Sequence, residues 1–320
     1  MNCHAIGLRR LDATIWTFIA LVAAFILSAA AFSDFTVVLR SFIAPTGCCL
    51  LLKFGAVYYR DWRNDLKLAS ALESTTQLVA FAAVGAPLSY VAASASLPLQ
   101  DAALAHLDNL LGFDWKEFLA CMHRWPNIFK LMHLAYLSLS LQMIAAVLVL
   151  GFTGRLFWLR VYMLSFIFAA LITIAISPVV PAEGAWLHYG ITGSDVLPLS
   201  HTSWPVFFGI RDGSFRQLVG VGAEGIITFP SLHAALAAIL VATFWPVPVM
   251  RWFAAFINCL VVVATPIDGS HYFVDVLAGI AIAGLSVAAA WAIARRLVSR
   301  PAPTGIQNAV PDPRPVLTLQ

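Results

Sequence analysis

The chain has 320 residues, of which 61% are hydrophobic and only 11% are charged. Soluble domains carry about 25% charged residues, so this composition excludes an ordinary soluble globular protein. The net charge of +3 is small and gives no indication of a nucleic-acid partner. Several apolar stretches of about 20 residues are long enough to cross a bilayer core of roughly 30 Å. We therefore predict an all-α fold, a polytopic membrane helical bundle.

About eight transmembrane helices are predicted from these stretches. They are expected at residues 14–32, 36–58, 75–95, 128–152, 157–176, 231–245, 252–265 and 270–294. The second contains Arg40, Pro45 and Lys53, and charged groups are costly at mid-bilayer. Arg40 and Lys53 lie near its two ends, where long side chains can reach the interface. Whether this helix crosses the membrane fully is left open.

Three polar segments complete the chain. Residues 97–127 have apolar positions at helical spacing, which is typical of an amphipathic segment lying in the membrane interface. Residues 177–228 form a long connection, and loops of this length usually carry function. The Pro-rich tail at 301–320 is expected to be disordered. The predicted organisation is a three-helix membrane region at 1–96, a second membrane domain at 97–300 and this tail.

Orientation follows from the excess of basic residues in cytoplasmic loops. With the amino terminus inside, every basic cluster that flanks a helix falls on the cytoplasmic side: Arg9/Arg10, Arg60/Arg63/Lys67, Arg155/Arg160, Arg251 and Arg295/Arg296/Arg300. We predict a multi-pass protein of the inner (plasma) membrane with both termini cytoplasmic. The 97–127 and 177–228 segments then face the periplasm or exterior.

The first functional motif begins at Pro230-Ser231, ahead of an Ala-rich apolar run. This pattern predicts a helix start with Ser231 as the N-cap. The free amides and the macrodipole at such a start favour an anion. His233 in the first turn is placed to donate a proton to that anion. The alternative is an interfacial histidine that merely ends a span.

The second motif contains His271 and, four residues later, Asp275. Asp268-Gly269 indicates a turn, Ser270 is a candidate cap, and His271 is expected in the first turn. Residues i and i+4 share one helix face, so Asp275 should pair with His271. Such a pair fixes the imidazole tautomer and leaves the other nitrogen free as a nucleophile or base. A structural His–Asp pair is the alternative.

These motifs resemble those of the type 2 phosphatidic acid phosphatase superfamily. Pro230-Ser231-Leu232-His233 is similar to its P-S-G-H motif, and His271 with Asp275 to the end of S-R-x-x-x-x-x-H-x-x-x-D. The segments FPSLHAA and HYFVDVLAG are most similar to sequences of the inositol phosphorylceramide synthase-like branch, including its bacterial-type members. The resemblance implies a vanadium-haloperoxidase/phosphatidic acid phosphatase-like catalytic core within 97–300. It also implies a metal-independent phosphoric monoester hydrolase or phosphotransferase without a cofactor, acting on a lipid phosphate among membrane lipids.

The resemblance also implies a role for each motif residue. His271 would form a phosphohistidine, Asp275 would orient it, and His233 would protonate the leaving oxygen. Ser231 and the amides after it would hold phosphate oxygens. The family's third-motif arginine aligns with Thr265, its second-motif glycine with Leu232, and no clear first motif is present. Phosphoryl transfer needs groups that match the charge on the phosphate, so the sequence leaves Arg211 and Arg216 as candidate phosphate-binding cations.

Several functions remain compatible with these residues. The expected activity is a lipid phosphatase or phosphotransferase at the outer leaflet, and the closest alternative is a phosphotransferase that moves a phospho-headgroup to a lipid alcohol. A transporter would use His271 and Asp275 as a proton relay. A zinc site would combine His233, His271 and Asp275, and a lipid-binding scaffold would use none of them catalytically. The sequence fixes neither the substrate nor the oligomeric state.

Overall fold

The computed structural model describes residues 3–191 and 198–299, so the predicted tail at 301–320 lies outside the described residues. Two residue pairs form a minimal parallel sheet, β1 (Thr36–Val37) with β2 (Gln217–Leu218). All other elements are helices: α1 Cys3–Phe32, α2 Arg40–Asp61, α3 Leu66–Ala93, α4 Asp101–Leu110, α5 Trp115–Arg124, α6 Pro126–Leu137, α7 Leu139–Phe152, α8 Leu156–Ile176, α9 Ala185–His188, α10 Pro198–Asp212, α11 Leu232–Phe244, α12 Arg251–Asp268 and α13 Phe273–Ser299. The predicted all-α bundle is confirmed.

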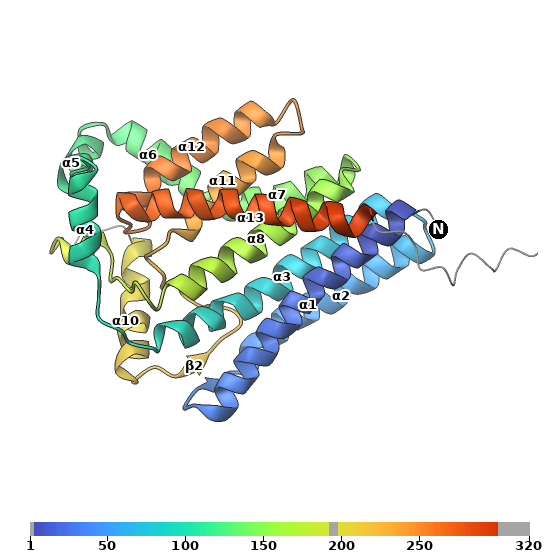
Figure 1. The fold of residues 1–320 in the computed structure, drawn as a ribbon, viewed down its shortest axis with the longest axis horizontal. Coiled ribbons are helices and arrows are strands. Elements are labelled where there is room, and N and C mark those ends of the chain that lie inside the picture. Colours follow the sequence, from blue (N-terminus) through green and yellow to red (C-terminus); the bar gives the residue numbers. More distant parts are fainter. Residues whose placement is uncertain (1–2, 192–197, 300–320) are drawn as a thin grey trace, which may run out of the picture.

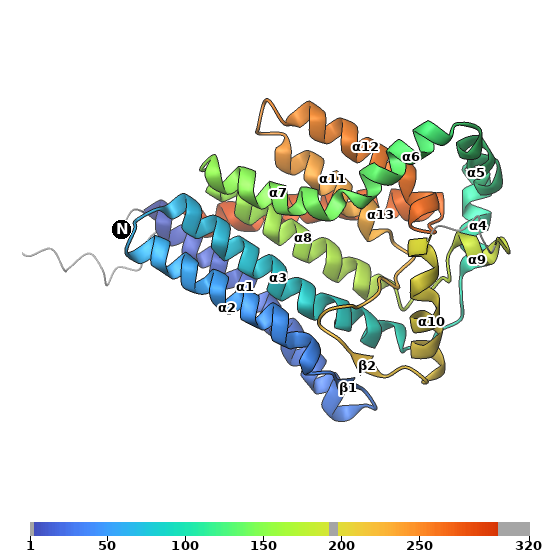
Figure 2. The same cartoon turned by 180° about the vertical axis from the view of Figure 1, so that it is seen from behind.

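The long helices run alongside one another, with α1, α2 and α3 on one side and α11 and α12 on the other (Figure 1). Helices α8 and α13 lie between these groups, and α13 contacts both α8 and α11. Helices α4, α5 and α10 lie across one end of the bundle in both views (Figure 2). This end carries the loops that precede α11 and α13, and therefore both motifs.

Among the described residues, six helices are long and apolar enough to cross a membrane, or seven if the bent pair α6 and α7 is one span. One further predicted segment, residues 231–245, corresponds to α11, an apolar helix that is shorter than these candidate spans. Helix α11 has 13 residues. At 1.5 Å per residue it extends about 20 Å, less than the roughly 30 Å of a bilayer core. Helices α6 and α7 meet at an angle of 50°, which breaks the predicted span at 128–152 (Figure 2).

Helix α2 qualifies as a candidate span despite its charged residues. Arg40 is its first residue, and Lys53 forms an ion pair with Glu73 of α3 at 2.6 Å. Glu73 also accepts a hydrogen bond from the indole of Trp16 in α1. Pairing removes most of the cost of placing these charges among apolar helices.

The predicted amphipathic connector contains α4 and α5. On α5, Trp115 and Leu119 are buried while Lys116 and Glu117 are exposed. The Trp115 indole donates to the carbonyl oxygens of Pro266 and His271, at 3.3 and 3.2 Å. The connector thus holds the loop between α12 and α13 in place.

Candidate active site

Ser231 caps α11, as the sequence predicts. Its Oγ accepts a hydrogen bond from the Ala234 amide at 3.3 Å, and its own amide donates to the Asp275 carbonyl at 3.1 Å. The amides of Leu232 and His233 make no hydrogen bond within the described residues. The first turn of α11 therefore keeps two donors available, close to the start of α13.

The turn before α13 differs from its prediction. Ser270 has a positive φ of 57° and does not cap the helix; its Oγ accepts from the Trp186 amide instead. The carboxylate of Asp108, on α4, accepts from the amides of Phe273 and Val274 at 2.8 Å each. Because a remote residue supplies the cap, α13 begins at Phe273 and His271 lies just before it, not in its first turn.

The predicted pair of His271 and Asp275 is present. His271 Nδ1 lies 3.3 Å from Asp275 Oδ2, and both residues are buried. Asp275 Oδ2 also accepts from the Tyr272 amide at 2.8 Å, so the carboxylate is held as in a capping box. Burial lowers the pKa of His271 from 6.5 to about 4, and a hydrogen bond to the Thr228 backbone opposes this shift. The imidazole is therefore neutral at neutral pH.

The second ring nitrogen of His271 faces another set of groups. A Cβ atom on Gly269 would lie 3.0 Å from His271 Nε2 and 2.9 Å from the Tyr136 hydroxyl. The Tyr136 ring stacks on His233, with ring centroids 4.7 Å apart, and the centroids of His233 and His271 are 6.4 Å apart. The structure thus brings the two predicted histidines together. Tyr136 of α6 is a further member of the site and packs against His233 of α11.

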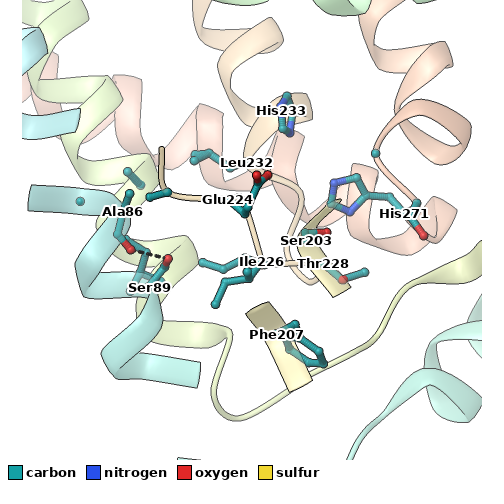
Figure 3. Close-up of a pocket in the computed structure, with 18 of the residues that line it drawn as sticks. Ala86, Ser89, Ser203, Phe207, Glu224, Ile226, Thr228, Leu232, His233 and His271 are labelled. Atoms are coloured by element: carbon teal, nitrogen blue, oxygen red, sulfur yellow. Dashed lines mark hydrogen bonds between the residues drawn. The ribbon is translucent and has the colours of Figure 1, made fainter. Parts of the chain in front are cut away.

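These groups line a cavity of about 440 Å³, within the range of small-molecule sites (Figure 3). One wall is apolar and comes from α3 and α8, which are both candidate membrane spans. Ionisable side chains on the lining are Tyr136, Glu183, Glu224, His233, Asp268 and His271. The cavity therefore joins a polar end to an apolar wall.

The other predicted site residues lie outside this lining. Ser231 is buried behind it, next to Asp275. Arg211 donates to the Leu97 carbonyl at 2.7 Å, and Arg216 donates to the Ile210 carbonyl at 2.9 Å. The structure does not bring these two guanidinium groups to the histidines.

Sequence reasoning missed three acids on the lining. It treated Asp268 as a turn residue, but this side chain is hydrogen-bonded to His133 Nδ1, so that it bridges α6 and α12. Glu183 and Glu224 lie in the loops before α9 and α11. The one available signal was the position of Glu224 in EGIITFPSLH, shortly before the first motif. No group of three or more metal-ligating side chains that could hold a metal ion is found in the described ranges.

Gly279 makes the close approach of α11 and α13 feasible. A Cβ atom there would lie 2.2 Å from the Ser231 carbonyl oxygen, whereas one on Gly284 of the same helix would meet nothing within 4 Å. We expect Gly279→Ala to destabilise the protein by about 1–3 kcal/mol and to displace the α11 cap. Gly284→Ala, the matched control, should be neutral or stabilising by up to about 1 kcal/mol. Thermal unfolding in detergent measures the difference, and equal stability of the two variants would contradict this packing.

The fold and site define an α-helical membrane protein with a buried His–Asp pair and a second histidine facing one cavity. A protein-family model described as PAP2 superfamily matches residues 102–289, which include both motifs. This match covers more than half of the chain, so the chain belongs to the PAP2 superfamily. A search of curated proteins and a search of solved structures each gave no match. The resemblance inferred from the motifs is confirmed for the superfamily, and the match does not resolve the branch.

Proposed function

We propose that this PAP2 superfamily protein is an integral membrane lipid phosphatase or phosphotransferase that works through a phosphohistidine on His271. The observation that carries the proposal is the His271–Asp275 hydrogen bond, with His233 on the opposite side of the same cavity. The catalytic unit would be the 97–300 domain, and the positive-inside pattern supports a site that faces the exterior.

The reaction would proceed in two steps. Asp275 holds Nδ1 of His271, so the lone pair of Nε2 attacks phosphorus and forms an N–P bond. The bond from phosphorus to the lipid oxygen breaks, and His233 gives that oxygen a proton. Water or an alcohol then attacks phosphorus, the N–P bond breaks, and His233 takes up the proton of the attacking group. The Leu232 and His233 amides are available to a phosphate oxygen.

An amphiphilic substrate fits the cavity better than a soluble phosphate. Its apolar wall includes Phe81 and Ala86 of α3 and Phe166 and Ile174 of α8. Apolar residues along candidate spans are suited to acyl chains, while the histidines meet the phosphate. A panel of labelled lipid phosphates, with and without ceramide or diacylglycerol, tests the proposal. Release of free phosphate indicates a hydrolase, and a new phospholipid indicates a phosphotransferase of the inositol phosphorylceramide synthase type.

The pH dependence should report the burial of His271. Burial lowers the pKa of both His271 and His233 to about 4, so the loss of activity through protonation of the His271 nucleophile should have its midpoint near pH 4. An exposed histidine would place that midpoint near pH 6.5. Unfolded chains take up this proton at about 6.5, so the folded state should also lose stability as the pH falls from that value towards 4. A pH–rate profile with an acid limb near 6.5 would contradict this environment.

We further propose that cleavage requires no metal ion, because the two histidines and Asp275 supply nucleophile, acid and orienting group. Activity should therefore survive extensive treatment with EDTA, and vanadate should inhibit it as a phosphate analogue. Phosphate release or lipid transfer is measured before and after chelation. Loss of activity with EDTA and its return with zinc would instead support a metal site.

A further inference from the structure

A second concave surface lies at the end of the bundle opposite the cavity that holds the two histidines. It is an open groove of about 550 Å³ between the last turns of α13 and the first turn of α8, and its lining includes Phe157, Trp291, Arg295, Arg296 and Ser299. Helix α13 has 27 residues, so it extends about 40 Å from its start beside the cavity. It ends near the N-terminus of the chain, far from α4 and α5 (Figure 1). The length of a membrane span therefore separates the groove from the histidines.

The groove is positively charged. Arg295 and Arg296 are exposed, and neither takes part in an ion pair within residues 3–191 and 198–299. No carboxylate lines the groove in this part of the chain. Asp12 of α1 is held by Arg160 of α8 through two hydrogen bonds, at 3.1 and 2.9 Å, so this acid is already engaged. Two guanidinium groups without a carboxylate beside them favour a negatively charged ligand.

The arrangement of Arg295 suits a phosphate in particular. Its guanidinium lies over the ring of Trp291, with Cζ 4.5 Å from the ring centroid. A stacked guanidinium uses its face for the ring and keeps the donors at its edge, which match two oxygens of a phosphate. The Ser299 hydroxyl donates to the Arg295 carbonyl at 2.8 Å, so the donors offered to a ligand come from the arginines.

The rest of the lining indicates that the ligand is an amphiphile. Phe157, Trp291, Ala292 and Val298 are apolar, and the Trp291 side chain is 40% exposed. Both α8 and α13 are candidate membrane spans, so their ends are expected at the surface of the bilayer. A free phosphate ion would meet only the arginines, whereas a phospholipid would also cover the apolar side chains. Basic pockets between membrane helices are suited to such headgroups.

We propose that this groove binds an anionic phospholipid of the leaflet opposite the active site. Its phosphate lies at Arg295 and Arg296, and its glycerol and first chain carbons lie against Phe157 and Trp291. A zwitterionic lipid is disfavoured, because its ammonium group would meet guanidinium groups of the same sign. With the predicted orientation, this leaflet is the cytoplasmic one. Binding makes and breaks no covalent bond, and the inference does not depend on the proposed function.

Native mass spectrometry of the purified protein tests the inference by counting bound lipids. Protein in detergent is titrated with phosphatidylglycerol or with phosphatidylcholine that has identical chains. We expect the wild type to bind one phosphatidylglycerol more than Arg295→Gln/Arg296→Gln does at the same lipid concentration. The double variant should bind this lipid about tenfold or more weakly at the groove. Phosphatidylcholine should bind equally to both proteins.

The matched control is Arg63→Gln/Arg251→Gln, which removes the same charge from two arginines outside the groove. Both belong to basic clusters predicted on the same side of the membrane. This control should bind phosphatidylglycerol as the wild type does, and thermal unfolding should match in all three proteins. Equal loss in the two double variants would show a general attraction of charge and overturn the inference. Equal loss of phosphatidylcholine and phosphatidylglycerol in Arg295→Gln/Arg296→Gln would also overturn it.

Inorganic phosphate separates the lipid from a free anion. Excess phosphate, compared with chloride at the same ionic strength, should leave the bound phosphatidylglycerol in place, because the apolar side of the groove holds the lipid as well. Displacement by phosphate beyond that by chloride would overturn the assignment of a lipid to this groove.

Discussion

His271→Ala is expected to lower lipid phosphate cleavage by at least about a thousandfold, because it removes the atom that forms the bond to phosphorus. Alanine also removes the ring that closes one side of the cavity, but the backbone contacts of His271 remain. Its amide donates to the Pro266 carbonyl, and its carbonyl accepts from Trp115. The variant should therefore fold, and activity should be measured on protein whose thermal unfolding matches the wild type.

The matched control is His123→Ala. His123 is exposed on α5 and does not line the cavity. It should retain wild-type activity. Substantial cleavage by the His271 variant at wild-type stability would rule out the proposed nucleophile.

Asp275→Asn should lower kcat on the order of 10³–10⁴-fold with little loss of stability. Asparagine keeps an oxygen that can accept from the Tyr272 amide, so the start of α13 is preserved. The same oxygen lies against His271 Nδ1, but a neutral amide neither holds the Nδ1 proton as strongly as a carboxylate nor stabilises positive charge on the ring, so Nε2 becomes a weaker nucleophile. The control for the loss of one carboxylate is Asp61→Asn, which changes an exposed aspartate that is paired with Arg60. A kcat within tenfold of wild type for Asp275→Asn would assign the pair a structural role.

The local parts of the site could be predicted from the sequence. A serine cap bonds to an amide three residues away, and a carboxylate four residues after a histidine meets it within one turn. Residues three or four positions apart in a helix lie next to each other, so these contacts can be predicted from the separation of the two residues in the sequence. The meeting of His233 and His271 also followed from topology, because α12 returns the chain to the end that α11 left.

The non-local parts could not be predicted in this way. Asp108 caps α13 from a position 165 residues away in the chain, and this contact moved the start of the helix beyond Ser270 and His271. The His133–Asp268 bond likewise joins α6 to α12. The loop acids Glu183 and Glu224 approach the histidines only through the packing of the whole bundle.

The bend between α6 and α7 has a local cause that hydropathy does not register. Ser138 lies at the junction, and its hydroxyl donates to the Ala135 carbonyl at 2.7 Å. Serine that bonds back to its own helix competes with the backbone ladder and is associated with bends. Gln142 donates to the same hydroxyl and accepts from Asn258 of α12. These polar contacts hold the bent segment against α12, within the stretch that the sequence predicts to be a single span.

If His271 carries the phosphate during turnover, the covalent intermediate can be trapped on this residue. Protein is mixed with a lipid phosphate labelled at phosphorus, quenched with base and digested, and the modified peptide is located by mass spectrometry. We expect an acid-labile, base-stable adduct on His271 that is absent from His271→Ala and unaffected by His123→Ala. Turnover without an adduct, or an adduct on another residue, would contradict it.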